Sequence, residues 1–216
     1  MQKGCERVAL LVAGSLGLWA LLVLASRRAQ LDWGASKTEA ASVLPGDDLV
    51  PHADLVATRA ISIAAPPALV WPWLVQIGIG RAGAYSYDWL ERLFGLDVHS
   101  SHAIVPELQH LAVGDVIPVE QDGRGLRVQA IEAESVLVTR TDDGDWSWTW
   151  VLRPMGDGTR LLSRTRMRTN HRSWLARASV AMILVPASWA MERRMLLGLR
   201  QRAERGSVTS GSTGGH

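Results

Sequence analysis

The stretch SWLARASVAMILVPASWAMERRMLLGLRQRAER, residues 173–205, decides how the rest of the chain must be arranged. Its centre, residues 178–191, carries no charge, and apolar residues continue beyond it at helical spacing. Such a surface must be covered either by lipid, as a second membrane segment, or by a folded sheet. A membrane-spanning helix needs about 20 apolar residues, whereas this centre is shorter and contains Pro186. We therefore expect a long helix from about Pro186 onward that packs on a sheet. The residues expected to face that sheet are Met191, Met195 and Leu199. Residues 173–185 fit either the sheet or a membrane surface.

The region before this helix has the pattern of an antiparallel sheet. Alternating or β-branched runs predict strands, and Gly/Asp-rich turns separate most of them. The predicted strands are residues 55–64, 116–120, 126–133, 135–141, 145–153 and 159–169. Two short amphipathic helices are expected between the first two strands, at about residues 68–77 and 85–95. The fold class is therefore α+β, with a curved sheet of about six strands around a long C-terminal helix.

Two strands carry unusual side chains at alternating positions. In DWSWTWV, residues 145–151, three indoles share one face, because strand side chains alternate between the two faces. These indoles either line a hydrophobic cavity or cover the helix that packs there. On the last strand Arg160, Arg164, Arg166 and Arg168 also alternate, and we expect them to form a solvated face rather than an anion site.

The N-terminal run VALLVAGSLGLWALLVLA, residues 8–25, is long enough and apolar enough to predict a single-pass membrane anchor. A cleaved signal peptide is the alternative, but the apolar run exceeds the usual length and Arg27 and Arg28 follow it directly. The Lys/Arg bias is nearly equal on the two sides and does not orient the chain. We expect an anchor at residues 1–28, a linker at 29–53, a folded domain at 54–205 and a disordered tail at 206–216.

The sequence gives little evidence for a cofactor-binding or metal-binding motif. The loop GIGRAG, residues 78–83, matches G-x-G-x-x-G but follows a helix-like segment rather than a strand, so we interpret it as a loop. His99, His102 and His110 lack the surrounding pattern of a zinc site, and Cys5 is the only cysteine. The formal net charge of +2 argues against a nucleic-acid partner. We therefore predict no cofactor and no metal.

Several motifs occur in an order that resembles one superfamily. The pair AAPP (64–67) and VW (70–71) after an apolar strand resembles the start of SRPBCC domains, which include START-like and polyketide cyclase-like proteins. Further motifs resemble a bacterial, largely uncharacterised branch of that superfamily: WLVQIG (73–78), GAYSYD (83–88), GDVI (114–117), TRLLSR (159–164) and MERRML (191–196). The resemblance covers about residues 54–204 and implies the helix-grip fold.

The resemblance also implies a hydrophobic cavity between the sheet and the long helix, occupied by a lipid or another apolar small molecule. Membrane-tethered binding of such a molecule is our first hypothesis. The residues expected to line the cavity are Trp73, Tyr85, Tyr87, Trp148, Trp150, Met191 and Met195. A cyclase or dehydratase acting on an apolar or aromatic substrate is the alternative, with His102, Tyr85 or Asp88 as acid–base group. No catalytic set can be named from the sequence. A core filled by its own side chains is the third hypothesis.

Overall fold

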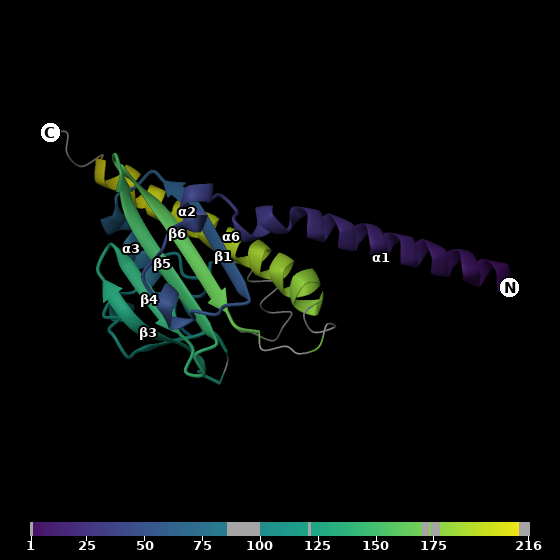
Figure 1. Cartoon of the computed structure of the whole chain (residues 1–216). Coiled ribbons are helices and arrows are strands. Elements are labelled where there is room, and N and C mark those ends of the chain that lie inside the picture. Colours follow the sequence, from purple (N-terminus) through teal and green to yellow (C-terminus); the bar gives the residue numbers. More distant parts are fainter. Residues whose placement is uncertain (1, 86–99, 121, 170–172, 174–177, 212–216) are drawn as a thin grey trace.

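The computed structural model describes residues 2–85, 100–120, 122–169, 173 and 178–211, with side chains described from residue 14 onward except at 16 and 207–211. Within the described residues the order along the chain is two helices, a strand, a helix, five strands and a long final helix. Figure 1 shows how these elements are arranged. The helices are α1 (Gln2–Leu31), α2 (Lys37–Ala41), α3 (Pro67–Val75) and α6 (Val185–Gly211), with short helical turns η1 (Asp47–Leu49) and η2 (Pro106–Leu108) and the π-helical turn η3 (Val180–Leu184). The predicted helix at residues 85–95 falls largely outside the described residues.

Six antiparallel strands form one sheet, as the sequence predicts. They are β1 (Leu55–Ile63), β2 (Val116–Pro118), β3 (Gly125–Glu132), β4 (Val136–Arg140), β5 (Trp146–Met155) and β6 (Gly158–Met167). Their spatial order is β1-β6-β5-β4-β3-β2, so strands β2 to β6 pair with their sequence neighbours and β1 closes against β6. The turns after β4 and β5 place Gly144 and Gly156 at positive φ, a backbone conformation that glycine adopts without strain. The α+β fold with a long C-terminal helix is therefore confirmed.

The inner face of the sheet, which we define as the face covered by α6, holds the main core. Ile61, Leu137, Trp150 and Leu161 from the strands pack with α3 and α6. The buried residues of α6 are Met195, Leu196, Leu199 and Ala203. Their spacing of three and four positions places them on one side of the helix. The predicted helix therefore does pack on the sheet.

Two details of α6 differ from the prediction. Met191 lies at the margin of the buried side and is 38% exposed, so the prediction that it faces the sheet is wrong. The helix also continues to Gly211, beyond the predicted start of a tail at Gly206, because an existing helix extends at low cost once its first turns have formed. Helical spacing alone could not separate Met191 from Met195, which is one turn away.

The outer face of the sheet is covered by the outer segment, residues 32–50, which contains α2 and η1. Leu44 of this segment packs with Ala60, Val151 and Leu162 in a second, smaller core. Glu39 forms an ion pair with Arg160, and Thr149 Oγ1 donates to the carbonyl of Pro45 at 3.1 Å. The segment predicted as a linker is therefore folded onto the sheet.

The arginines of β6 hold the outer segment against the sheet through hydrogen bonds. Arg164, whose side chain is 3% exposed, donates to Thr58 Oγ1, to Asp47 Oδ2 at 2.7 Å and to three backbone carbonyls. Arg166 donates to the carbonyl of Val50 at 3.1 Å. The prediction of a solvated arginine face is therefore wrong for Arg160, Arg164 and Arg166. The partners are mostly backbone carbonyls, which leave no trace in a side-chain pattern.

One contact of the outer segment lies beside β1. The N–H of Ala60 donates to the carbonyl of Trp33 at 3.0 Å, and Arg160 Nη2 donates to the carbonyl of Gly34 at 2.6 Å. Gly34 has a φ of +72°, and a Cβ atom there would lie 2.1 Å from the carbonyl oxygen of Ala60. Only glycine fits at this point, because the two backbones approach too closely for a side chain.

Helix α1 extends away from the sheet and α6 in Figure 1, and only its C-terminal end reaches the rest of the molecule. There Arg59 Nε of β1 donates to the carbonyl of Gln30 at 3.0 Å. Within the described part of the chain, no helix combines the length and the apolarity needed to cross a membrane. The membrane anchor predicted at residues 8–25 is not confirmed.

Candidate functional site

Three indoles form a continuous row along the inner face of β5, and we call Trp146, Trp148 and Trp150 the indole row. The rings of Trp146 and Trp148 stack with centroids 6.0 Å apart, and those of Trp148 and Trp150 lie 4.4 Å apart and tilted. Burial increases along the row, from the partly exposed Trp146 to Trp150, which is 1% exposed. The row therefore connects the surface with the core beneath α6.

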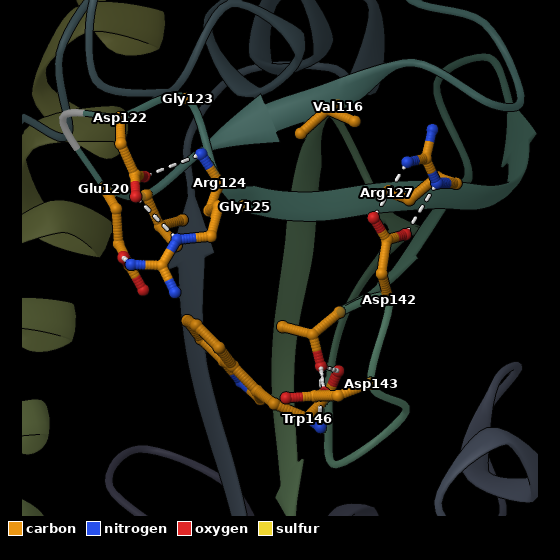
Figure 2. A pocket seen from close by; sticks show the side chains of 12 residues that line it. Val116, Glu120, Asp122, Gly123, Arg124, Gly125, Arg127, Asp142, Asp143 and Trp146 are labelled. Atoms are coloured by element: carbon orange, nitrogen blue, oxygen red, sulfur yellow. Dashed lines mark hydrogen bonds and ion pairs between the residues drawn. The ribbon is translucent and has the colours of Figure 1, made fainter.

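An open groove of about 470 Å³ lies at the outer end of the row. Its walls are the turn between β2 and β3 and the turn between β4 and β5, with Trp146 between them (Figure 2). Arg124 pairs with Glu120 and Asp122 on one side, and Arg127 pairs with Asp142 at 2.8 Å on the other. Asp143 accepts a hydrogen bond from Thr141 at 2.6 Å. Both arginines of the rim are therefore paired with carboxylates, and the partly exposed indole of Trp146 lies between its two sides.

A set of polar residues lies at the inner end of the row. Arg59 of β1, Ser163 of β6 and Trp150 of β5 are direct cross-strand neighbours on the inner face. Glu192 of α6 faces them and forms a buried ion pair with Arg59. We call Arg59, Ser163, Trp150 and Glu192 the polar rung. Burial raises the pKa of the Glu192 carboxyl, and the charge of Arg59 opposes that rise.

Hydrogen bonding in the polar rung is incomplete. Arg59 donates three hydrogen bonds. Its Nε donates to the carbonyl of Gln30, its Nη1 to Glu192 Oε2 and its Nη2 to Ser188 Oγ at 3.3 Å. The second carboxylate oxygen of Glu192 and the indole N–H of Trp150 have no partner among the described residues. Ser163 lies beside Glu192 and lowers its pKa, but not in a geometry that gives Oε1 a hydrogen bond. Buried polar atoms without partners are uncommon in proteins and call for a physical reason.

Of the two other indoles in the row, one has a hydrogen-bonded N–H and the other does not. The N–H of Trp148 donates to Ser163 Oγ at 2.7 Å, whereas the buried N–H of Trp146 has no partner within the described chain. Along the row, the indole N–H groups of Trp146 and Trp150 therefore have no hydrogen-bond partner among the described residues, whereas that of Trp148 does.

Tyr85 is buried but belongs to a structural network. Its hydroxyl accepts from Gln76 Nε2 at 2.7 Å, and its ring meets Trp73 edge to face at 6.1 Å. Burial raises the pKa of Tyr85 to about 12, so the phenol stays protonated at neutral pH. Gln76 also accepts from the N–H of Val105 at 3.0 Å, which fixes the loop around η2. Tyr85 has a φ of +55°, a strained value that these contacts maintain.

The predicted lining residues fall into three groups. Tyr85, Trp150 and Met195 belong to the main core, and Trp73 and Trp148 are partly buried against it. Met191 is at the exposed margin of α6, and Tyr87 lies outside the described residues. Whether any of them contacts a ligand stays a prediction.

The acid–base candidates do not converge. His102 is exposed, Tyr85 is held by Gln76, and Asp88 lies outside the described residues. Of the three histidines, His102 and His110 are both exposed and His99 is not described. The described residues contain no cluster of three or more His, Cys, Asp or Glu side chains that could hold a metal ion.

The sequence analysis missed Arg59 and Glu192, although both leave a signal. Arg59 stands between Ala57 and Ile61 on the apolar side of the alternating β1 pattern. Glu192 precedes Met195 by one turn on the buried side of α6. Opposite charges that interrupt two apolar faces predict a buried pair, because neither charge could be buried alone.

Comparisons with known proteins give no assignment. No family model matches the chain, and no curated protein matches it. Among solved structures, a KanY protein has 14% sequence identity and a TM-score of 0.43, covering 69% of this chain and 97% of that one. An AHSA1-like protein from Aeromonas hydrophila has 18% identity and a TM-score of 0.40, covering 74% of this chain and 98% of its own.

A Polyketide_cyc-like protein from Corynebacterium glutamicum has 16% identity and a TM-score of 0.36, covering 74% of this chain and 96% of its own. At TM-scores below 0.5, these similarities assign neither family nor activity to this chain. The functional argument therefore depends on the site itself.

Proposed function

We propose that this protein binds a hydrophobic small molecule or lipid along the indole row, between the sheet and α6. The observation that carries the proposal is the row itself, which runs without interruption from an open groove to a buried polar rung. A purely structural core would have no need of an indole that borders a groove and is partly exposed there. Ligand sites commonly combine such apolar surface with a few polar groups that set orientation.

The binding energy would come from burial of apolar ligand surface. Each Å² removed from water contributes about 25 cal/mol before the cost of ordering the ligand. Flat rings would gain further from contact with indole faces. The groove lining carries four carboxylates and only two arginines, so an anionic ligand is disfavoured there and an uncharged ligand fits better.

We further propose that α1 brings the domain to a membrane, as a single-pass anchor formed by residues 8–25. Leu18, Leu21 and Leu22 are each more than half exposed, which is unfavourable in water. Arg27 and Arg28 follow the apolar run, where anionic headgroups would accept them. In vesicle flotation, the full chain should rise with the lipid and a chain that begins at residue 29 should not. Equal behaviour of the two chains would contradict the membrane proposal alone.

An enzyme of cyclase or dehydratase type is the second candidate function. The observation that favours it is the carboxyl of Glu192, which lies beneath α6 beside Arg59 and whose pKa burial raises above its ordinary value. Its ion pair with Arg59 counts against this function, because the pair holds the carboxylate in its charged form. A mass change in a bound ligand that Glu192→Gln abolishes would favour the enzyme.

The binding proposal is tested with the purified full chain. Mass spectrometry of an organic extract should show an apolar compound, and the apolar dye Nile red should bind and be displaced by it. Trp146→Ala should weaken dye binding about 10-fold, because it removes the aromatic surface in the groove. Trp33→Ala, an indole outside the row, serves as the matched control. No extracted compound together with no dye binding would contradict the proposal.

A further inference from the structure

Most of the large hydrophobic side chains that are exposed in the described chain lie at one end of the molecule. They belong to two neighbouring helical segments: Leu18, Trp19, Leu21, Leu22 and Leu24 on α1, and Ile183, Leu184 and Met191 on η3 and the first turns of α6. Figure 1 shows that α1 and the N-terminal end of α6 extend to the same side of the sheet. An exposed apolar surface of this kind indicates a partner rather than bulk water.

Helix α1 and the start of α6 lie side by side in a defined register. The guanidinium of Arg59 donates to the carbonyl of Gln30 at 3.0 Å and to Ser188 Oγ at 3.3 Å, so these two positions are level. Two turns further out on the two helices are Val23 and Ala181, because a turn holds about 3.6 residues. Helix α1 does contact η3 there, and Val23 is 7% exposed although its neighbours on both sides are more than half exposed.

This register places η3 beside the end of the apolar run of α1, residues 8–25. Val23 belongs to that run and lies on the side of α1 that the folded domain covers. A segment that is level with these turns and touches their helix must enter the same medium as they do. If the run occupies a bilayer, Ile183 and Leu184 therefore meet lipid rather than water.

The exposed side of α6 continues the apolar surface of η3. Ile183, Ala187 and Met191 are all exposed and follow one another at intervals of four positions, so they share one side of the helix. We call these three residues the α6 strip. Arg194, which is also exposed, follows Met191 by three positions on that side. The order from the outer end inward is apolar first and basic afterwards, as in α1, where Arg28 follows the apolar run.

The charges beside the α6 strip are nearly all positive. Residues 178–200 contain one carboxylate, Glu192, which is buried and paired with Arg59. Arg193 and Arg194 are exposed next to it. Residues 14–31 of α1 contain no acidic residue at all. An apolar tip with basic residues behind it is complementary to a bilayer whose headgroups are anionic.

We propose that η3 and the α6 strip form a second contact with an anionic lipid bilayer, beside α1. The domain then sits directly on the membrane, with the N-terminal end of α6 among the headgroups. This inference rests on the proposed anchor and adds the part of the domain that touches lipid. The strip is too small to hold the domain by itself, since even one acyl chain gives only marginal membrane binding.

The depth of single side chains in the bilayer tests this contact. In the full chain carrying Cys5→Ser, the substitutions Ile183→Cys, Ala187→Cys and Met191→Cys each introduce one site for the fluorescent dye NBD. The chain is reconstituted in vesicles of equal parts phosphatidylcholine and phosphatidylglycerol that contain a lipid with a spin label near its headgroup. Quenching should be strongest at position 183 and weakest at 191, because each step moves about 6 Å along the helix.

Met155→Cys is the matched control, because Met155 is a 51% exposed apolar side chain at the opposite end of the domain. At that end the N–H of Ala64 donates to Glu204 Oε1 of α6 at 2.9 Å, and β1 pairs with Thr159. NBD at position 155 should not be quenched by lipid. In vesicles of phosphatidylcholine alone, quenching at position 191 should fall more than at 183, because the arginines lose their anionic partners.

The outcomes separate this inference from the proposed anchor. If the full chain does not float with vesicles, the anchor is wrong and this inference falls with it. If the chain floats but position 183 is quenched no more than position 155, the anchor stands and the inference is overturned. Equal quenching in the two lipid mixtures would overturn the anionic preference. A dye at 183 that is shielded from water without lipid quenching, in a chain that sediments as a dimer, would mean that a second copy covers the strip instead.

Discussion

On the outer face of the sheet Arg164 makes five hydrogen bonds with its three side-chain nitrogens, whereas on the inner face Glu192 leaves one carboxylate oxygen without a partner in the described chain. Both side chains are charged and both are buried. The outer network is complete within the protein itself, so it fixes the outer segment in place. The inner network leaves that oxygen without a partner among the described residues.

This difference separates groups that serve stability from groups to which the proposed function gives a role in binding. A satisfied buried network is rigid and strongly destabilised when one member is removed. An unsatisfied one contributes less to stability than its burial suggests, and its removal therefore costs less. Four substitutions test that distinction, in order of decreasing expected effect.

The largest effect is expected for Arg164→Ala. This change removes five hydrogen bonds made by a buried guanidinium, including the ion pair with Asp47, and should lower the free energy of unfolding by about 3–5 kcal/mol. Arg168→Ala is the matched control, since its pair with Asp145 is 39% exposed and should contribute within about 0.5 kcal/mol. Urea denaturation measures both. Similar losses for the two variants would remove the basis of the comparison.

Arg59→Met tests the inner pair. Alone it leaves Glu192 buried without its counter-charge and should cost about 3 kcal/mol at neutral pH. Adding Glu192→Leu should restore most of that loss, because two apolar side chains then replace two charges. Denaturation of the single and double variants decides the point. A double variant as unstable as the single one would mean that the pair is needed for folding.

The same variants carry a pH dependence. Burial raises the folded-state pKa of Glu192 above 4.5, so the folded protein binds the proton more tightly than the unfolded chain does. This group's contribution to stability is therefore present at low pH and is lost as the pH rises through the window above 4.5. The double variant lacks the group and should lack this component of the pH profile.

Glu39→Gln should have an intermediate effect on the outer face. The hydrogen bond with Arg160 lowers the pKa of Glu39 to about 2, so its stabilisation is present above pH 4.5 and is lost as the pH falls through about 2. At neutral pH the variant should be less stable by about 2 kcal/mol, after allowance for partial exposure. The difference from the parent chain should shrink on acidification. A difference that is constant with pH would mean that packing rather than charge is responsible.

The smallest effect on stability is expected for Trp146→Phe. The N–H of Trp146 has no partner among the described residues and its ring is partly exposed, so the free energy of unfolding should change by about 0.5 kcal/mol or less. Binding of Nile red should nevertheless weaken. A large loss of stability with unchanged dye binding would place Trp146 with the structural residues instead.

The sequence was informative where its signals are local. The strands were predicted within a few residues, because turns such as the one at Gly144 need a positive φ that glycine supplies. The long helix followed from the length of its uncharged centre and the position of Pro186. The row of Trp146, Trp148 and Trp150 followed from alternation on β5 alone.

The sequence was uninformative where contacts are long-range and polar. Arg164 binds the carbonyls of Glu39, Ala40 and Ser42, and a carbonyl is present at every residue, so no pattern in residues 29–53 marks the partners. Arg59 and Glu192 lie 133 positions apart, and only the fold brings them together. The predicted lining set named Trp150 and Met195 but not the charged pair, because hydrophobicity guided the choice.

The contact between Trp33 and Ala60 has a consequence for solubility. β1 is an outermost strand of the sheet, and such a strand presents unpaired backbone groups that can pair with another copy of the chain and start aggregation. The carbonyl of Trp33 occupies the N–H of Ala60, and the close approach of Gly34 covers the same strand. The outer segment therefore shields the edge of the sheet as well as its face. A chain that begins at residue 54 should self-associate at concentrations where the full domain stays monomeric, which light scattering would show.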